Sequence, residues 1–190
     1  MHEEVEIKVS IKNTDDVMKF LSINGNFLKE RHQRDEYFVL SNRDFFREEP
    51  VSEYLRIRKE DGNNQVAYHF CHYSKNGKMQ KTDEYETAVS DPEMMSAIFI
   101  KLGMISKVVV DKKRKYFEYK GYQILIDHIE KMGYFLEIET ESHEGNYELA
   151  KINCYQVLNE IGAKWEETPD VGYPDMLLKK MKLEKNKSQT

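Results

Sequence analysis

The sequence predicts an α+β fold, mainly β, in which about eight antiparallel strands are interrupted by about three helices. Apolar residues alternate with polar ones at a period of two along most of the chain, which is typical of strands with one buried face. Short turn motifs such as Asp61-Gly62-Asn63-Asn64 join many of these segments directly. Parallel strands need long crossover connections, so an antiparallel sheet or barrel is favoured.

The alternation is clearest near the N-terminus, where Val5, Ile7, Val9 and Ile11 alternate with charged or polar residues. Similar patterns recur further along the chain and predict the remaining strands. The predicted strands cover residues 4–11, 33–40, 54–58, 65–75, 83–89, 104–119, 122–129 and 135–139.

Capping residues and helical periodicity predict the helices. Thr14 is a plausible cap for a helix over residues 15–23, which carries two acidic residues in its first turn. Ser90 and Glu93 have the spacing of a capping box and begin a second helix. Apolar residues at helical spacing predict the third helix over residues 147–161.

Composition excludes several classes of protein. The chain has 190 residues, which favours one domain, here assigned to residues 1–178 with a polar, frayed tail over residues 179–190. It contains no apolar run long enough for a transmembrane helix and no signal peptide, so we expect a cytoplasmic protein without membrane association. Two cysteines, Cys71 and Cys154, are too few for a disulfide framework and are expected to pack in the interior. The net charge of −5 argues against broad binding of nucleic acid.

Charged residues of one sign occur in pairs at positions i and i+2 on five predicted strands, where they share a face. The pairs are Glu4 with Glu6, Arg56 with Arg58, Glu84 with Glu86, Lys112 with Arg114, and Glu137 with Glu139. One such pair is expected on any solvated sheet face. Five pairs of both signs are harder to explain in that way, because like charges on one strand are unfavourable without partners.

If these faces turn inward in a barrel, acids and bases line a common lumen. Lysine and arginine bind phosphate oxygens, and carboxylates hold a hard divalent cation such as Mg²⁺ or Mn²⁺. A polyphosphate with its metal ion would supply both counter-charges. Two histidines, His69 and His72, are expected on opposite faces of one strand and make a poor metal pair.

At these residues the sequence resembles the CYTH superfamily, which is named for class IV adenylate cyclases and thiamine triphosphatases. The segment Glu4-Val5-Glu6-Ile7-Lys8 resembles the Glu-x-Glu-x-Lys signature of that superfamily. The later motifs follow in the order of the family. They are Arg56-Ile57-Arg58, Asp83-Glu84-Tyr85-Glu86, Lys112-Lys113-Arg114, Asp127, Gly133-Tyr134-Phe135-Leu136-Glu137-Ile138-Glu139, and Gly172-Tyr173-Pro174-Asp175-Met176-Leu177, in which Gly172 replaces the serine of the family.

This resemblance implies the triphosphate tunnel fold, an eight-stranded antiparallel closed barrel with outer helices. It also implies residue roles. The implied metal ligands are Glu4, Glu6, Glu84, Glu86, Glu137 and Glu139. The implied triphosphate ligands are Lys8, Arg56, Arg58, Lys75, Lys112 and Arg114, with Lys78 and Lys81 as alternatives to Lys75. The implied catalytic group is Glu4, Glu6, Lys8 and Asp127, the last of which holds a basic residue or metal-bound water.

The resemblance implies a divalent-metal-dependent enzyme that acts on triphosphates, with Mg²⁺ or Mn²⁺ as cofactor. The segments 33–38 and 54–56 are most similar to the class IV adenylate cyclase subgroup, which converts ATP to cyclic AMP and pyrophosphate. A triphosphatase acting on inorganic triphosphate, thiamine triphosphate or a nucleoside triphosphate is the alternative, and a non-enzymatic polyphosphate or nucleotide binder ranks lower. A monomer and a homodimer both remain open.

Overall fold

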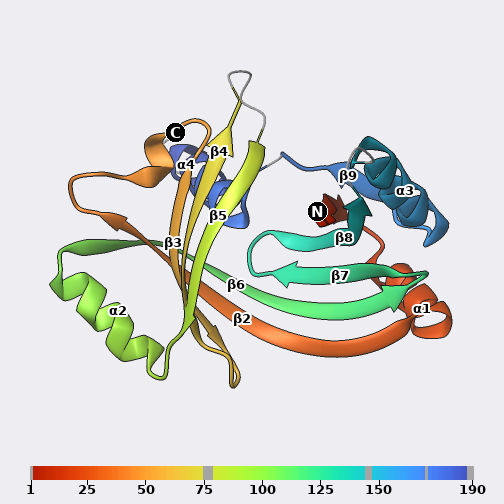
Figure 1. The fold of residues 1–190 in the computed structure, drawn as a ribbon, viewed down its shortest axis with the longest axis horizontal. Helices are drawn as coiled ribbons and strands as arrows, with labels where there is room; N and C mark the ends of the chain where they lie inside the picture. Colours follow the sequence, from red (N-terminus) through yellow and green to blue (C-terminus); the bar gives the residue numbers. More distant parts are fainter. Residues whose placement is uncertain (1, 75–78, 144–146, 170, 188–190) are drawn as a thin grey trace. The chain divides into compact units, whose positions relative to one another are not determined.

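The structure is a computed structural model of the chain and describes residues 2–74, 79–143, 147–169 and 171–187. Within these residues it contains nine strands, four α-helices and one short 3₁₀ helix, η1 (Figure 1). In chain order the elements are β1 (His2–Ile11), α1 (Thr14–Asn24), β2 (Asn26–Leu40), η1 (Phe45–Arg47), β3 (Glu53–Glu60), β4 (Gln65–Tyr73), β5 (Met79–Ala88), α2 (Pro92–Lys101), β6 (Met104–Tyr119), β7 (Tyr122–Ile129), β8 (Gly133–His143), α3 (Tyr147–Glu160), β9 (Trp165–Glu167) and α4 (Tyr173–Lys187).

The strands form one sheet in the order β5-β4-β3-β2-β6-β7-β8-β1-β9, and the described strand pairs are antiparallel. The predicted mainly-β, antiparallel α+β fold is therefore confirmed. Strands β5 and β9 stand at the two ends of this order, and no pairing among the described residues joins them. Closure into a barrel stays a prediction.

The structure contains one more strand and one more helix than the sequence predicted. The additional strand, β9, has only three residues, which is too short to show alternation. The additional helix, α4, buries only Tyr173, Pro174 and Leu177, so its sequence shows no apolar stripe. This helix continues into the segment that we assigned to the polar tail, where its described side chains from Lys179 onward are exposed.

The chain divides into two compact units. The first unit contains Met1–Arg31 and Lys112–Asp170, and the second contains His32–Asp111 and Val171–Thr190. Strands β2 and β6 are long, with 15 and 16 residues, and each contributes residues to both units.

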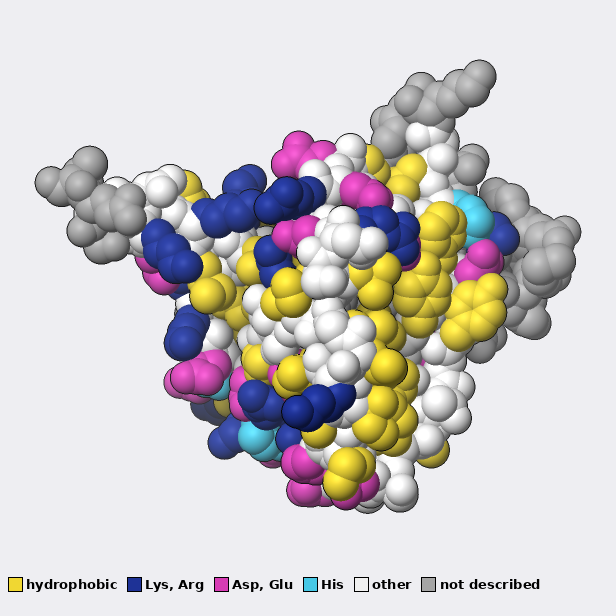
Figure 2. All heavy atoms as spheres, turned by 90° about the vertical axis from the view of Figure 1, so that its left-hand side faces the viewer, with side chains coloured by type: hydrophobic (Ala, Val, Ile, Leu, Met, Phe, Trp, Pro, Cys, Tyr) yellow, Lys and Arg dark blue, Asp and Glu magenta, His cyan; other side chains and the backbone are white. Residues whose placement is uncertain are grey.

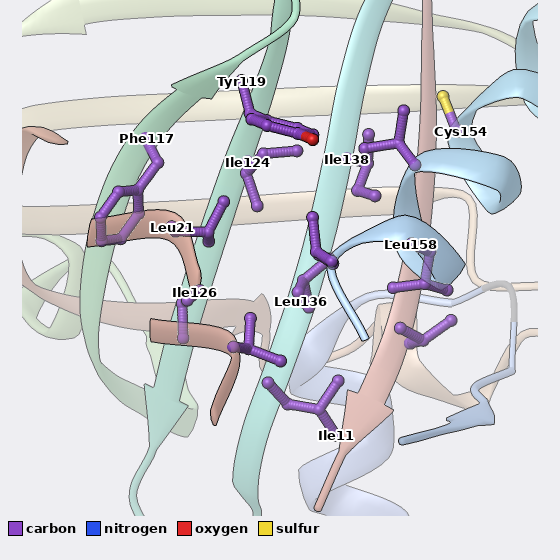
Figure 3. Close-up of a cluster of buried hydrophobic side chains, with 14 of the residues drawn as sticks. Ile11, Leu21, Phe117, Tyr119, Ile124, Ile126, Leu136, Ile138, Cys154 and Leu158 are labelled. Carbon is purple, nitrogen blue, oxygen red and sulfur yellow. The ribbon is translucent and has the colours of Figure 1, made fainter. Parts of the chain in front are cut away.

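The core of the first unit lies between one face of its sheet and the helices α1 and α3 (Figure 3). The alternation in β1 sets this face, because Val5, Ile7, Val9 and Ile11 are at most 5% exposed. Leu136 and Ile138 of β8, Leu21 of α1, and Cys154 and Leu158 of α3 are also fully buried there. The expected packing role of Cys154 is thus confirmed. The predicted site residues of these strands lie on the opposite face of the sheet.

The second unit is built from β5, β4, β3 and β2 with the helices α2 and α4. Phe38 of β2 is fully buried, and its ring meets that of Phe99 in α2 edge to face, at 5.2 Å between centroids. The hydroxyl of Tyr54 in β3 donates a hydrogen bond to Asp175 in the first turn of α4, at 2.9 Å. This hydrogen bond joins the motif over residues 172–177 to β3, the strand that carries Arg56 and Arg58. No helix within the described residues is long and apolar enough to span a membrane.

Candidate functional site

The predicted site residues of the first unit share the sheet face that turns away from the hydrophobic core. Strand register explains this arrangement, because Arg114 of β6 stands opposite Asp127 of β7, while Lys8 of β1 stands opposite Glu137 of β8. The alternate residues of the same strands point into the core. The pattern of alternation that predicted the strands therefore also gathers these charges on one surface.

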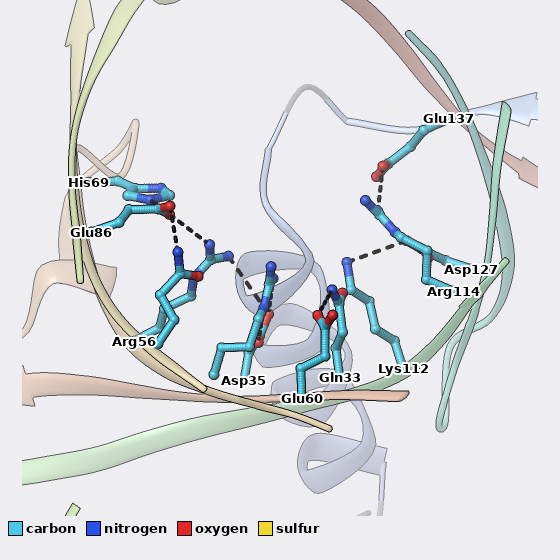
Figure 4. A network of polar contacts seen from close by, with 12 residues as sticks. Gln33, Asp35, Arg56, Glu60, His69, Glu86, Lys112, Arg114, Asp127 and Glu137 are labelled. Carbon is cyan, nitrogen blue, oxygen red and sulfur yellow. Dashed lines mark hydrogen bonds and ion pairs between the residues drawn. The ribbon is translucent and has the colours of Figure 1, made fainter. Parts of the chain in front are cut away.

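Asp127 lies at the centre of this group and is fully buried. Arg114 binds it with two parallel hydrogen bonds, from Nε to Oδ1 at 2.7 Å and from Nη2 to Oδ2 at 2.6 Å (Figure 4). The same Nη2 also donates to Glu137, and the Nζ of Lys112 lies 3.6 Å from Asp127. The buried Lys112 and the partly buried Arg114 are thus held by two buried carboxylates, as burial of charge requires.

Three carboxylates of the first unit form a group that could hold a metal ion. One oxygen each from Glu6, Glu137 and Glu139 lies within 4.8 Å of the others. Glu6 is exposed, Glu137 is buried and Glu139 is intermediate, so the group reaches from the interior to the surface. An all-carboxylate donor set suits a hard divalent cation such as Mg²⁺ or Mn²⁺.

A second set of charges lies on one face of β2 and β3 in the second unit. Arg58 binds the buried Asp35 with two hydrogen bonds, both of 2.7 Å, and Arg56 lies 3.8 Å from the same carboxylate. The Nε of Arg56 is buried and has no hydrogen-bond partner among the described residues. Tyr37 shares this face, and burial followed by the charge of Asp35 raises its pKa to about 12, so it stays a neutral phenol.

Glu86 of β5 accepts hydrogen bonds at both of its oxygens. Gln65 donates to Oε2 at 2.6 Å, while Arg56 donates to Oε1 at 3.2 Å and the Nε2 of His69 lies 3.0 Å from the same oxygen. Burial alone would raise the pKa of Glu86, but the hydrogen bond with His69 and the charge of Arg56 outweigh it and lower that pKa below its usual value. Ligand atoms of His69, Glu84 and Glu86 lie within 4.8 Å of one another, which makes them a second candidate metal group.

Most of the predicted site residues fall into these two groups, but three lie outside what the structure describes. Lys75 and Lys78 are outside the described residues, and for Glu4 the structure gives the backbone position in β1 and not the side chain. Lys81, the remaining alternative to Lys75, is exposed, alternates with Glu84 and Glu86 along β5, and pairs with Asp83 at 3.0 Å. It therefore lies on the opposite face of the strand from those two glutamates.

Sequence reasoning missed two members of the site. Asp35 escaped attention because it is the single acid on its strand face, although an acid two residues before the buried Tyr37 shares that face. His69 was compared only with His72, and the two do lie on opposite faces, since His72 pairs with Asp83 at 2.6 Å and His69 with Glu86. The relevant comparison was with the neighbouring strand, where Glu84 stands directly opposite His69.

Comparisons with known proteins find relatives of this chain over most of its length. The family model of the CYTH domain matches residues 2–164. A Methanocaldococcus jannaschii protein that carries the name "Putative adenylate cyclase" is 41% identical over 138 residues, which cover 72% of this chain and 75% of that protein.

Solved structures also resemble this chain. A Pyrococcus horikoshii protein, PH1819, is 27% identical with a TM-score of 0.70, over 94% of this chain and 99% of that one. A second solved structure is that of HpAC1 from Hippeastrum, described as a "putative adenylyl cyclase" with a dominant triphosphatase activity. It is 17% identical with a TM-score of 0.65, over 90% of this chain and 93% of the HpAC1 chain. At that identity HpAC1 supports the fold alone.

Proposed function

Because this chain belongs to the CYTH domain family, we propose that it is a divalent-metal-dependent enzyme acting on triphosphates, and that its reaction is the class IV adenylate cyclase reaction, from ATP to cyclic AMP and pyrophosphate. The observation that carries this proposal is the convergence of Glu6, Glu137 and Glu139 within 4.8 Å, beside the buried Lys112 and the partly buried Arg114. A metal group next to a cationic group is what a metal–triphosphate complex requires. The relative from Methanocaldococcus jannaschii, with its cyclase name, supports the same reaction.

We assign a metal ion in the first unit to Glu6, Glu137 and Glu139, with Glu4 as a further ligand from the family signature, and we assign Glu84 and Glu86 as metal ligands within the second unit. The carboxylate oxygens of Glu6, Glu137 and Glu139 fit Mg²⁺ or Mn²⁺ by their chemistry. A bound cation would supply charge neutralisation at the non-bridging phosphate oxygens and lower the pKa of an attacking hydroxyl or water.

The basic residues are assigned to the phosphates, with Lys8, Lys112 and Arg114 in the first unit and Arg56 and Arg58 in the second. Arg114 and Lys112 contact Asp127, Arg58 and Arg56 contact Asp35, and Arg56 also donates to Glu86. Phosphate oxygens accept hydrogen bonds from guanidinium and ammonium groups, so a bound triphosphate would add a further anionic partner to these cations. The sheet is proposed to close into the eight-stranded tunnel of the family.

Asp127 is proposed as a catalytic group that keeps Arg114 in place through its two hydrogen bonds. In the cyclase reaction the 3′-hydroxyl of ATP attacks the α-phosphorus, the bond to the bridging oxygen breaks, and pyrophosphate leaves. The arginine and lysine side chains hold the triphosphate in line and stabilise the charge that develops on it.

A triphosphatase is the second candidate, because the same proposed ligands suit either reaction and HpAC1, a protein of this fold, is described with a dominant triphosphatase activity. In that reaction water attacks the γ-phosphorus and orthophosphate leaves, with the same cations and carboxylates in use. The two reactions differ in where the triphosphate lies relative to the metal ion.

The test is incubation of the purified protein with ATP, inorganic triphosphate and thiamine triphosphate, each with Mg²⁺ and with Mn²⁺, followed by chromatography. Cyclic AMP with pyrophosphate supports the cyclase, and orthophosphate with a diphosphate supports the triphosphatase. The variant Glu137→Gln should lose turnover by at least a hundredfold, whereas Glu130→Gln, at an exposed turn position, should keep it. Full turnover by Glu137→Gln would contradict the metal assignment.

A further inference from the structure

The side chain of Gln33 in β2 carries a buried oxygen that nothing in the described part of the chain satisfies. Gln33 is 3% exposed, and its Nε2 donates to Oε2 of Glu60 in β3 at 2.6 Å. Its Oε1 is buried and has no hydrogen-bond partner among the described residues. The reverse orientation of the amide would bring its oxygen against a carboxylate oxygen at that distance, so Glu60 fixes Oε1 as the unsatisfied atom.

This oxygen lies at the end of the charged face of the second unit. The strands β2 and β3 pair Gln33 with Glu60 and Asp35 with Arg58, so Gln33 lies one same-face position beyond the arginine pair. That step is about 7 Å along a strand. Figure 4 shows Gln33 and Glu60 together, next to Asp35 on the same strand.

The chemistry of Gln33 and Glu60 demands a donor rather than another phosphate. Oε1 of Gln33 and the carboxylate of Glu60 can only accept hydrogen bonds. Ionised phosphate oxygens are also acceptors only, so a phosphate group cannot satisfy Oε1. A hydroxyl or an amino group would satisfy the orphaned oxygen. Inorganic triphosphate has neither group, but the nucleoside part of a nucleotide has both.

The cleft of about 570 Å³ in the second unit does not face this oxygen. His32 and Arg34 of β2 and Lys59 of β3 line it together with the first turn of α2, and these residues alternate with Gln33 and Glu60 along their strands. A donor for Oε1 therefore has to come from a ligand on the face of Arg56 and Arg58.

We infer that Gln33 determines specificity, because its Oε1 accepts a hydrogen bond from a hydroxyl or amino group on the nucleoside part of the triphosphate held by Arg56 and Arg58. This inference rests on the proposed function. A ligand that lacks the donor leaves a buried acceptor unsatisfied, which is how a site built for hydrogen bonding rejects an analogue. Gln33 thereby favours nucleoside triphosphates over inorganic triphosphate.

The experiment measures equilibrium binding of ATP and of inorganic triphosphate by calorimetry, with Ca²⁺ in place of Mg²⁺ and product analysis to show that the ligands stay intact. Gln33→Met removes the acceptor at nearly the same side-chain length, and Gln33→Lys removes it while keeping a donor for Glu60. The matched control is Gln65→Met, because the amide of Gln65 also donates to a carboxylate at 2.6 Å, that of Glu86.

The ratio of the ATP dissociation constant to that of inorganic triphosphate should rise about tenfold in both Gln33 variants and stay within twofold in Gln65→Met. The analogues 2′-deoxy-ATP, 3′-deoxy-ATP and purine riboside triphosphate lack the 2′-hydroxyl, the 3′-hydroxyl and the amino group of ATP, respectively. One of them should bind the wild-type protein as weakly as ATP binds Gln33→Met, and the group missing from that analogue is the donor to Oε1.

An unchanged ratio in the Gln33 variants, or no sensitive analogue, would overturn the inference while leaving the proposed function intact, and would indicate that a water molecule satisfies the oxygen. Failure of the wild-type protein to bind any triphosphate would overturn both. Retained affinity for inorganic triphosphate in the variants shows that they are folded.

Discussion

Replacement of Asp127 by asparagine tests the buried charge cluster of the first unit most sharply. Asp127 is fully buried, receives two hydrogen bonds of 2.7 and 2.6 Å from Arg114, and lies 3.6 Å from Lys112, which is itself only 5% exposed. The variant Asp127→Asn keeps one acceptor oxygen but leaves the buried Lys112 and the partly buried Arg114 with one fewer negative charge. Removal of one partner from a buried ion pair lowers the free energy of unfolding by about 3–5 kcal/mol. Because Asn retains one acceptor, we expect a loss of about 3 kcal/mol for this variant.

Urea unfolding followed by the fluorescence of Trp165 measures this cost. Trp165 is the single tryptophan of the chain and packs against the core of the same unit. For a chain of this length, about 3 kcal/mol corresponds to a fall in melting temperature of about 6–12 °C. Inorganic triphosphate should raise the melting temperature of Asp127→Asn by more than that of the wild-type protein, because phosphate restores the missing negative charge.

The control is Glu166→Gln, which breaks the exposed ion pair between Glu166 and Lys12. Exposed ion pairs contribute about 0–1 kcal/mol, so this variant should unfold almost as the wild-type protein does. A loss below about 1 kcal/mol for Asp127→Asn, equal to that of the control, would refute the argument that the cluster is held together by buried charge.

Three further predictions concern the metal group, a buried phenol and the core. Glu139→Gln should weaken Mn²⁺ binding, followed by electron paramagnetic resonance, by at least tenfold, whereas Glu130→Gln should not; equal affinities would remove Glu139 from the metal group. The pKa of Tyr37 is raised to about 12, so its folded form holds the proton more tightly, and its contribution to stability is present below pH 10 and lost as the pH rises from about 10 to 12. Tyr37→Phe should therefore lose less unfolding free energy between pH 9 and pH 11 than the wild-type protein, and parallel curves would contradict the assignment. Leu136→Ala should cost about 2–5 kcal/mol in urea unfolding, because Leu136 is fully buried in the core of the first unit, and a cost below about 1 kcal/mol would contradict that packing.

The sequence predicted the strands of the first unit well because their two faces differ so strongly. Val5, Ile7, Val9 and Ile11 of β1 are buried, and the residues between them include Glu6 and Lys8, so period-two alternation located both the core and the charged face. Strand β9 and helix α4 escaped prediction for a physical reason, since neither carries enough buried residues to show a period.

The partners of the charged residues could not be predicted from local sequence, because strand register is a long-range property. Alternation placed Arg114 and Asp127 on strand faces, but only the pairing of β6 with β7 makes them direct neighbours. The same holds for His69, whose neighbour Glu84 comes from another strand. The lone acid Asp35 lacked the paired-charge pattern on which the predictions relied.

The measurement that tests the central claim most directly is a ³¹P NMR spectrum of ATP incubated with the purified protein and Mg²⁺, recorded with and without EDTA. The account predicts that the triphosphate signals disappear in Mg²⁺, with cyclic AMP and pyrophosphate formed by a cyclase or orthophosphate and ADP by a triphosphatase, and that EDTA prevents either change. Unchanged ATP in Mg²⁺, or equal turnover in EDTA, would contradict the claim that the carboxylates and basic residues of this chain act together on a metal–triphosphate complex.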